Sequence, residues 1–286
     1  MRSEEKNRII EGTLYLVATP IGNLSDMSER ALKVLSEVDF IAAEDTRNTL
    51  RMLTHFGISK PLVSYFEHNK AQRGEQIVER LLGGESCALV TDAGTPAISD
   101  PGEDIVRLCA ENGVPVTAIP GACAGICALA LSALSTERFC FEGFLPMKKS
   151  DRKERLEKLS NEERTMIFHE APHKLRDTLD DFEKYFGADR KISLCRELTK
   201  LNEEVMRVTL GEAVAYYKEN DPRGEYVLVV EGGVYEESDS QLGQLSVEEA
   251  VDLYMSRGMP KMDAIKKVAK ERGIPKNEVY KLFNND

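Results

Sequence analysis

The sequence lacks the glycine patterns of the common nucleotide-binding enzymes. No two glycines are separated by a single residue, so the G-x-G-x-x-G fingerprint of nicotinamide-binding folds and of many methyltransferases is absent. The P-loop motif G-x-x-x-x-G-K-[ST] and the G-x-S-x-G turn are absent as well. These absences argue against a nicotinamide-dependent dehydrogenase, a P-loop ATPase and a hydrolase with a nucleophile elbow.

Long apolar runs are also missing. The longest surrounds residues 128–131 and is interrupted by Ser132 and Ser135, which makes it too short to span a bilayer. The first eleven residues are rich in Arg, Glu and Lys, so we expect no secretory signal there. Six cysteines lie in apolar stretches of a 286-residue chain, which is large enough to fold without disulfides. We therefore expect reduced thiols, a cytoplasmic location and no membrane partner.

The net charge is −11, but the basic residues are unevenly distributed. Residues 257–286 carry eight Lys or Arg against four acidic residues, and residues 147–158 carry six against three. The acidic balance argues weakly against a coat that binds nucleic acid regardless of sequence. The local basic patches need another explanation.

The first half of the chain alternates short apolar runs with amphipathic segments. The runs are Leu14–Ala18, Phe40–Ala43, Leu62–Phe66, Cys87–Thr91 and Val116–Ile119. The amphipathic segments are Ser28–Ser36, Thr46–Phe56, Gln72–Leu82 and Glu103–Asn112. This alternation predicts an α/β domain with a parallel sheet covered by helices.

The second half predicts a mixed sheet with antiparallel pairs and fewer helices. Its strand-like runs are Phe139–Phe144, Thr165–His169, Ile192–Arg196, Val205–Leu210 and Tyr226–Glu231. A helix over Ala122–Leu134 is apolar nearly all round, so we expect it to be buried. The polar and acidic stretch Gly232–Gly243 is typical of a linker.

Three helices are predicted beyond this linker, over Val247–Arg257, Met262–Arg272 and Asn277–Phe283. Ser246 and Glu249 have the spacing of a capping box, and Gly258 and Gly273 end the first two helices. Short helices with glycine turns and basic residues resemble a helix-turn-helix that contacts nucleic acid, although a structural cap has the same pattern. The candidate phosphate contacts are Lys266, Lys267, Lys270, Arg272, Lys276 and Lys281. The expected domains are thus 1–121, 122–234 and 246–286.

One motif suggests zinc, but its context argues against a metal site. His169, Glu170 and His173 match H-E-x-x-H, which binds zinc only when a helix places both imidazoles on one face. Pro172 cannot lie inside such a helix. We expect His169 to end a strand, Pro172 to begin a helix that runs to Phe186, and no metal to bind.

The most informative segment is the loop from Asp92 to Gly102, which follows a strand and precedes a helix. Open α/β sheets bind ligands at the carboxyl ends of their strands. The loops Ala18–Leu24 and Ile119–Ala124 have the same strand, small-residue and helix order. Each alone is consistent with an ordinary tight turn, but three at one sheet edge predict a shared cleft. Polar segments also follow strands at Ala43–Arg47 and Tyr65–Asn69.

These loops resemble the ribosomal RNA small-subunit methyltransferase I family, of the tetrapyrrole-methylase superfamily, from about Gly12 to Gly233. The segments that carry the resemblance are V-A-T-P-I-G-N-L-S-D, A-E-D-T-R, S-Y-F-E-H-N, T-D-A-G-T-P-A-I-S-D-P-G, I-P-G-A-C-A, F-E-G-F-L-P, H-E-A-P-H-K-L, R-E-L-T-K and G-E-Y-V-L-V-V-E-G. The resemblance implies two α/β domains with a cofactor cleft, a helical tail, and usually a homodimer. It implies that S-adenosylmethionine methylates the 2′-oxygen of a cytidine in the decoding region of small-subunit rRNA, either free or in the 30S subunit.

Position by position, the resemblance also implies which residues bind the cofactor. They are Pro20, Ile21, Asp92, Gly94, Thr95, Ile98, Cys123, Ala124, Glu170, Ala171 and the segment Gly224–Tyr226 with Glu225. The family's residue at the position of Cys123 is small and often hydroxylated, so a thiol is a mild departure.

The resemblance transfers no general base, although a ribose hydroxyl must lose its proton to attack. The polar strand-end segments supply the candidates, which are Asp45, Glu67, His68, Glu170 and Glu197. Arg47 and Arg196 are candidates to hold RNA phosphate. Two alternatives are a porphyrinoid C-methyltransferase of the same superfamily and a nucleic-acid-binding regulator that senses a small ligand. The basic tail argues against the first, and the polar cleft loops argue against the second.

Overall fold

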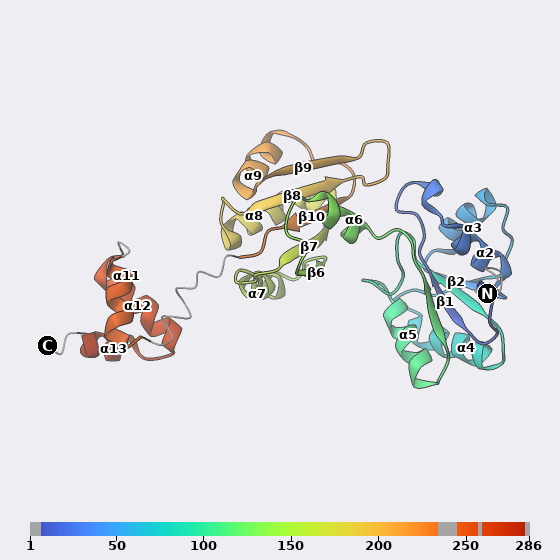
Figure 1. The fold of residues 1–286 in the computed structure, drawn as a ribbon, viewed down its shortest axis with the longest axis horizontal. Helices are drawn as coiled ribbons and strands as arrows, with labels where there is room; N and C mark the ends of the chain where they lie inside the picture. Colours follow the sequence, from blue (N-terminus) through green and yellow to red (C-terminus); the bar gives the residue numbers. More distant parts are fainter. Residues whose placement is uncertain (1–6, 234–244, 257–258, 284–286) are drawn as a thin grey trace. The chain divides into compact units, whose positions relative to one another are not determined.

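The first half of the chain folds into a parallel sheet of five strands (Figure 1). The structure is a computed structural model that describes residues 7–233, 245–256 and 259–283. The strands are β1 (Leu14–Val17), β2 (Phe40–Ala43), β3 (Leu62–Ser64), β4 (Cys87–Val90) and β5 (Val116–Ile119). Their order is β3-β2-β4-β1-β5, and every neighbouring pair is parallel. The predicted parallel architecture is confirmed.

Helices cover both faces of this sheet, because side chains of a strand alternate between its faces. Helices α2 (Glu29–Glu37) and α3 (Thr46–His55) pack against Val17 and Ile41 on one face. Helices α4 (Lys70–Leu82) and α5 (Gly102–Glu111) pack against Phe40 and Leu89 on the other (Figure 1). The short 3-10 helix η1 (Leu24–Asp26) lies in the loop after β1. Because β4, β1 and β5 are adjacent and parallel, their carboxyl ends lie next to one another.

The second sheet is mixed, as predicted. Its strands are β6 (Phe139–Gly143), β7 (Thr165–Glu170), β8 (Lys191–Arg196), β9 (Glu204–Thr209) and β10 (Tyr226–Val230). They lie in the order β6-β7-β10-β8-β9. Only β6 and β7 are parallel, and the other neighbouring pairs are antiparallel.

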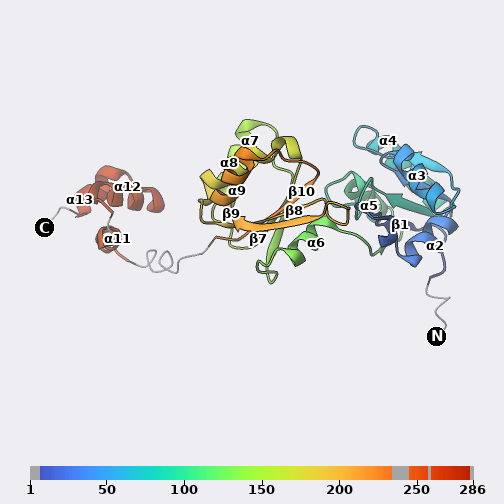
Figure 2. The ribbon, with the colours of Figure 1, turned by 90° about the horizontal axis from the view of Figure 1, so that it is seen from above.

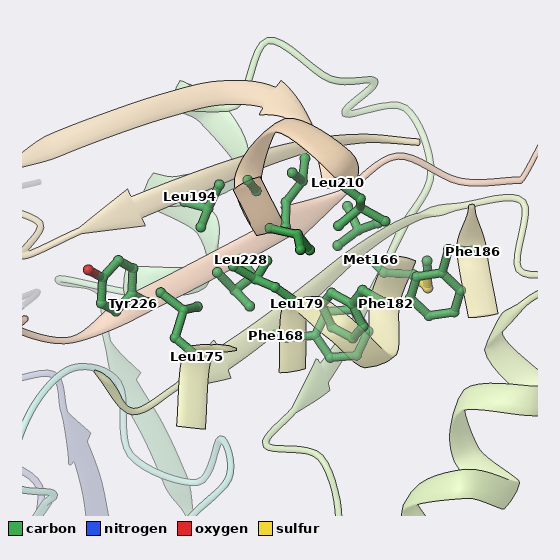
Figure 3. Packing of buried hydrophobic residues seen from close by; sticks show 14 of the residues in the cluster. Met166, Phe168, Leu175, Leu179, Phe182, Phe186, Leu194, Leu210, Tyr226 and Leu228 are labelled. Atoms are coloured by element: carbon green, nitrogen blue, oxygen red, sulfur yellow. The ribbon is translucent and has the colours of Figure 1, made fainter. Parts of the chain in front are cut away.

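Helices α7 (Lys149–Leu159), α8 (Leu175–Phe186) and α9 (Leu210–Glu219) lie on one face of the second sheet, and α6 (Ala124–Leu131) lies on the other (Figure 2). Alternate residues of β10 follow this division. Tyr226 and Leu228 pack with the α7–α9 side, and Val227 and Val229 pack with α6. Figure 3 shows the larger core, where Phe168 and Phe182 lie with ring centroids 4.8 Å apart.

Two expectations for this half are wrong. Helix α6 is not buried all round, because it packs on the sheet by one face and leaves Ile126 49% and Leu131 38% exposed. The sheet is also covered by more helices than expected, since α7 and α9 were not predicted. Helix α7 buries only Leu156 and Leu159 among charged residues, so its sequence carries little apolar periodicity.

The tail forms three helices that pack on one another, namely α11 (Val247–Ser256), α12 (Lys261–Arg272) and α13 (Lys276–Phe283). The predicted capping box is present, since Ser246 and Glu249 exchange side-chain to backbone hydrogen bonds of 2.6 and 3.1 Å. Gly273 ends α12 in the left-handed conformation, with φ of 63°. The predicted cap Gly258 and the acidic linker, with Glu236, Glu237 and Asp239, lie outside the described residues.

The chain divides into two compact units, Met1–Gly232 and Gly233–Asp286. The first unit contains both sheets, and the predicted boundary between residues 121 and 122 falls between β5 and α6. The three domain ranges stay predictions. Within the described ranges, none of the helices is long and apolar enough to cross a membrane.

Candidate active site

The three small-residue loops meet at one edge of the parallel sheet. The backbone groups of Thr19, after β1, pair with those of Gly94, after β4, at 2.9 and 3.0 Å. The hydroxyl of Thr95 donates to the carbonyl of Ala122, after β5, at 2.9 Å. Adjacent parallel strands place their carboxyl ends together, so the cleft that the sequence predicts has its three loops in contact.

The loop after β4 has an unusual and well-supported backbone. Gly94, Ala97 and Ser99 all have positive φ values, of 85°, 66° and 63°. Asp100 holds this path, because its Oδ1 accepts hydrogen bonds from the backbone N–H groups of Ala97 (3.0 Å) and Gly102 (2.7 Å). Burial raises the pKa of Asp100. Two non-glycine residues in the left-handed region cost energy, and such strain is typical of ligand-binding loops.

Two cavities adjoin these loops. The first has a volume of about 390 Å³ and the second about 370 Å³. Both are lined by Ile21, Ala93, Ala124, Phe144 and His169, so they share one wall. A donor in one cavity and an acceptor in the other would meet at this shared wall.

Most of the predicted cofactor residues line these cavities. The first cavity is lined by Ile21, Gly94, Thr95, Ile98, Cys123 and Ala124. The second is lined by Ile21, Ala124, Glu170, Ala171, Glu225 and Tyr226. Pro20 and Asp92 are not among the lining residues of either. The cofactor role of each residue stays a prediction.

Asp92 faces the start of α3. Its Oδ1 accepts a hydrogen bond of 3.2 Å from the backbone N–H of Asp45. Partial burial and the nearby carboxylate of Glu44 raise the pKa of Asp92. The acidic side chains that line the first cavity are instead Glu44 and Asp100. Glu44 directly follows β2 in the A-E-D-T-R segment and accepts a hydrogen bond of 2.9 Å from the Thr91 hydroxyl.

The four proposed catalytic carboxylates lie in different surroundings. Asp45 is paired with Arg47 at 2.8 Å, and hydrogen bonds from Arg47 lower the pKa of Asp45 to about 2. Glu67 is paired with Lys70 at 2.8 Å. Asp45, Glu67 and His68 line neither of the two cavities.

Glu170 and Glu197 do line the second cavity. Glu170 is buried and accepts hydrogen bonds from the Ala171 N–H, at 2.9 Å, and from the Thr178 hydroxyl. Glu197 accepts from the Lys200 Nζ at 2.9 Å, and this hydrogen bond lowers the pKa of Glu197. Lys200 Nζ also lies 2.8 Å from Glu225, so one ammonium joins two carboxylates at this cavity.

The two histidines of the H-E-x-x-H segment belong to different elements. His169 lies in β7, and His173 lies in the 3-10 helix η2 (Pro172–Lys174). Pro172 was expected to begin a helix that runs to Phe186; it begins the 3-10 turn η2, and the α-helix that runs to Phe186 starts at Leu175. Among the residues with described positions, no group of three or more His, Cys, Asp or Glu is arranged to hold a metal ion.

The candidate phosphate contacts are partly occupied by protein partners. Arg196 is paired with Glu204 at 2.9 Å, and Lys266 with Asp263 at 3.0 Å. Lys267 Nζ lies 4.4 Å from the centre of the Tyr254 ring. The other predicted contacts in the tail that stay exposed are Lys270, Lys276 and Lys281.

Known proteins resemble this chain over most of its length. The family described as Tetrapyrrole (Corrin/Porphyrin) Methylases matches residues 13–214. A protein of Halalkalibacterium halodurans named ribosomal RNA small subunit methyltransferase I is 47% identical over 278 residues, covering 96% of each chain. A Synechocystis protein of the same name is 45% identical over 271 residues, covering 95% of this chain and 97% of its own.

Solved structures share the fold. Uroporphyrin-III C-methyltransferase from Thermus thermophilus, in complex with S-adenosylhomocysteine, has a TM-score of 0.54 at 15% identity. The similarity covers 76% of this chain and 96% of that one. The chain therefore belongs to the tetrapyrrole methylase family and, within it, to the ribosomal RNA small subunit methyltransferase I family. This membership confirms the predicted methyltransferase class and its dependence on S-adenosylmethionine.

Proposed function

We propose that this chain transfers a methyl group from S-adenosylmethionine to the 2′-oxygen of a cytidine in the decoding region of small-subunit rRNA. The observation that carries the proposal is the pair of adjoining cavities with a shared wall, because methyl transfer needs a donor site and an acceptor site in contact. Sequence identity of about 45% to rRNA methyltransferases over nearly the whole chain, tail included, supports RNA as the acceptor.

The residues present fit S-adenosylmethionine. The small residues Ala93 and Ala124 line both cavities and Gly94 lines the first, so their side chains leave space for a ligand. A Cβ on Gly94 would lie 3.4 Å from Ile21. Glu170 and Glu225, two of the predicted cofactor contacts, supply carboxylates that suit a cationic ligand at the second cavity. The bound cofactor supplies an activated methyl group on a sulfonium, so the protein's main contribution is to align the acceptor and exclude water.

Proton removal from the ribose hydroxyl is assigned to a carboxylate that borders the cavities. Among the candidates, Glu170 and Glu197 meet this condition, whereas Asp45 and Glu67 are paired with Arg47 and Lys70 elsewhere. The hydrogen bond from Lys200 lowers the pKa of the Glu197 carboxyl, which keeps Glu197 ionised but makes it a weaker base, so both carboxylates stay candidates.

A porphyrinoid C-methyltransferase is the alternative enzyme, since the solved structures of the same fold include one. Transfer of labelled methyl groups to small ribosomal subunits, followed by nuclease digestion and nucleoside analysis, tests the proposal. Label in 2′-O-methylcytidine supports it. Label on a porphyrinoid but not on RNA favours the alternative, and label on neither favours a ligand-sensing regulator.

We also propose that the enzyme acts in the cytoplasm as a homodimer on rRNA or on the assembled 30S subunit. The exposed apolar face of α6, with Ile126 and Leu131, is consistent with a second copy covering it. Sedimentation equilibrium at micromolar concentration measures the oligomeric state, and a monomer under these conditions contradicts the dimer.

A further inference from the structure

Three phenylalanines and one histidine form an aromatic wall on the first cavity. Phe139 and Phe141 come from β6, Phe144 follows this strand, and His169 comes from β7. The His169 ring lies 5.4 Å from the Phe141 ring and 5.6 Å from the Phe144 ring, between centroids. We call these four side chains the aromatic wall.

The aromatic wall is more exposed than core packing requires. Phe139, Phe141 and Phe144 are 40%, 37% and 61% exposed, whereas Phe168 and Phe182 in the neighbouring core are buried. Large exposed aromatic side chains that gather at a cavity mark a ligand site more often than a folding requirement.

Local backbone features open the space in front of the wall. The pairing of β6 with β7 shifts register between Phe141 and Gly143, and Gly143 has φ of 62°. This bulge changes the course of the strand just before Phe144. On the α6 side, a Cβ on Gly125 would lie 3.5 Å from the Phe141 ring, in van der Waals contact, so the backbone of α6 lies close to this ring.

The predicted cofactor contacts leave this wall unused. They come from the loops after β1, β4, β5, β7 and from the start of β10, and none comes from β6. Phe144 and His169 line both cavities, so the wall begins where the two cavities meet. A group held against it would lie beside the cofactor.

We propose that the aromatic wall stacks the unpaired nucleobase of the target nucleotide, and that Glu44 and Asp100 accept hydrogen bonds from its exocyclic amino group. This proposal rests on the proposed function and assigns the acceptor base to the side of the first cavity that the aromatic wall lines. An enzyme that reacts at a nucleotide inside folded RNA gains access by extruding it and stacking its base on aromatic side chains. A ring wall alone accepts any base, because every base has a π-face.

The two carboxylates add selectivity to the stacking. Each has unused lone pairs, since an ionised carboxylate offers about four acceptor sites, and Glu44 and Asp100 use one oxygen each in the hydrogen bonds described above. Cytosine presents an N4 amino group to such acceptors, whereas uracil presents the O4 carbonyl in its place. The first cavity is therefore matched to cytosine and mismatched to uracil.

Saturation-transfer NMR on the protein loaded with S-adenosylhomocysteine tests the subsite without requiring turnover. Cytidine and uridine are the probes. We expect transfer to the cytosine ring protons in the wild type, weaker transfer to uridine, and loss of the cytidine signal in Phe144→Ala. Phe144→Tyr keeps the ring and should keep the signal. Tyr216→Ala, which removes an aromatic side chain that is 44% exposed on α9, is the matched control and should match the wild type.

Methylation kinetics give the second measurement. Phe144→Ala should raise KM for small ribosomal subunits by about 10- to 100-fold, the range expected when one base loses its stacking partner, with S-adenosylmethionine affinity within twofold of the wild type. Glu44→Gln replaces one acceptor oxygen by a donor and should reduce the preference for cytidine over uridine by about tenfold.

The outcomes separate the two proposals. If wild-type protein binds cytidine but methylates no rRNA, the subsite stands and the proposed function fails. If rRNA is methylated but Phe144→Ala leaves cytidine binding and KM unchanged, the subsite is wrong. Loss of S-adenosylmethionine affinity in Phe144→Ala, with KM for RNA unchanged, would assign the wall to the cofactor's adenine and would also overturn the subsite.

Discussion

Thr19 and Gly94 bind each other through both backbone groups, the N–H of each donating to the carbonyl of the other at 2.9 and 3.0 Å. The Thr19 hydroxyl adds a hydrogen bond of 3.2 Å to the carbonyl of Thr91. The loop after β1 is thus joined to the loop after β4 next to the two cavities, which Ile21 and Ala93 of these loops both line. A ligand contacting both loops meets a surface that is already formed, which lowers the entropic cost of binding.

Gly94→Ala should weaken both folding and cofactor binding. Gly94 has φ of 85°, where an alanine costs roughly 1–2 kcal/mol. The new methyl group would also lie 3.4 Å from Ile21 and would occupy space at the cavity wall. Urea denaturation should show this loss of stability, and calorimetry should show at least about tenfold weaker S-adenosylmethionine binding, equivalent to about 1.4 kcal/mol.

Gly113→Ala separates the two effects. Gly113 also has a positive φ, of 70°, but a Cβ there would meet nothing within 4 Å. Gly113 lines neither cavity. It should lose similar stability and keep wild-type cofactor affinity. Equal cofactor affinity in both variants would contradict the assignment of the Gly94 loop to the cofactor.

Asp92→Ala tests the acidic cofactor contact that the resemblance implies. The carboxylate lies in a loop rather than in a core, so its removal should leave the fold intact while weakening S-adenosylmethionine binding. Part of the effect would pass through Asp45, whose N–H donates to Asp92. Asp189→Ala, an exposed loop carboxylate, is the control. Unchanged calorimetric affinity in folded Asp92→Ala would contradict the assignment of Asp92 to the cofactor.

The stability of the loop after β4 should depend on pH through Asp100. Burial raises the pKa of Asp100 above its unfolded value. Its stabilising contribution is therefore present below the unfolded pKa, of about 3.9, and is lost as pH rises through the folded pKa. Asp100→Asn keeps an acceptor oxygen but cannot ionise, so it should gain stability relative to wild type between about pH 4 and 7.

Asp45→Asn should show the opposite sign. Hydrogen bonds from Arg47 lower the pKa of Asp45 to about 2, so its contribution is present above the unfolded pKa and lost as pH falls toward 2. This variant should lose stability relative to wild type as pH rises from about 2 to about 5, and the difference should stay constant above that range. Urea midpoints at four pH values measure both differences, and parallel slopes in the two variants would refute the assignments.

The strands and the meeting of the three loops could be predicted from the sequence, whereas side-chain directions could not. Runs such as Phe40–Ala43 match their strands because apolar runs bounded by polar turns specify a buried parallel strand. Glycine and small residues after β1, β4 and β5 then identify one sheet edge. Whether Asp92 or Asp100 points into the cleft depends on backbone angles at Ala97 and Ser99, which no periodicity records.

The aromatic wall was missed for a related reason. In the sequence, Phe139 and Phe141 have the alternation of an ordinary strand, and only the fold shows that their side of β6 lacks a full cover. Helix α6 was misjudged by the same logic. Its apolar residues predicted burial, but a helix that lies on one face of a sheet contacts it by one side only, and Ile126 lines the first cavity.

Zinc should be absent from the purified enzyme. His169 and His173 lie in different elements, and burial lowers the pKa of His169, whose ring contacts Phe141 and Phe144. Metal analysis should find no stoichiometric zinc, and methyl transfer should persist in chelator. One zinc per chain that disappears in His169→Ala would reverse this interpretation.

The helical tail should contribute to RNA binding and not to cofactor binding. It is a compact unit with its own core, so deletion of residues 246–286 should leave the two sheets folded and the S-adenosylmethionine affinity unchanged. Buried Ala264, Ile265 and Val268 fix one face of α12, and Lys266, Lys267 and Lys270 are exposed. Removing one lysine–phosphate ion pair should reduce the salt slope of RNA binding by roughly 0.7–0.9.

A double substitution in the intact chain distinguishes docking from a structural cap. Lys270→Gln with Lys276→Gln removes two exposed charges without touching the core of the tail, so its thermal stability should match the wild type. If these lysines meet phosphate, the salt slope falls by between one and two units while cofactor binding is unchanged. If the tail is only a cap, the double variant binds RNA like the wild type, and the deletion either loses cofactor and RNA binding together or changes neither. Measuring both ligands on both variants decides between the two roles, because only docking lowers RNA affinity alone.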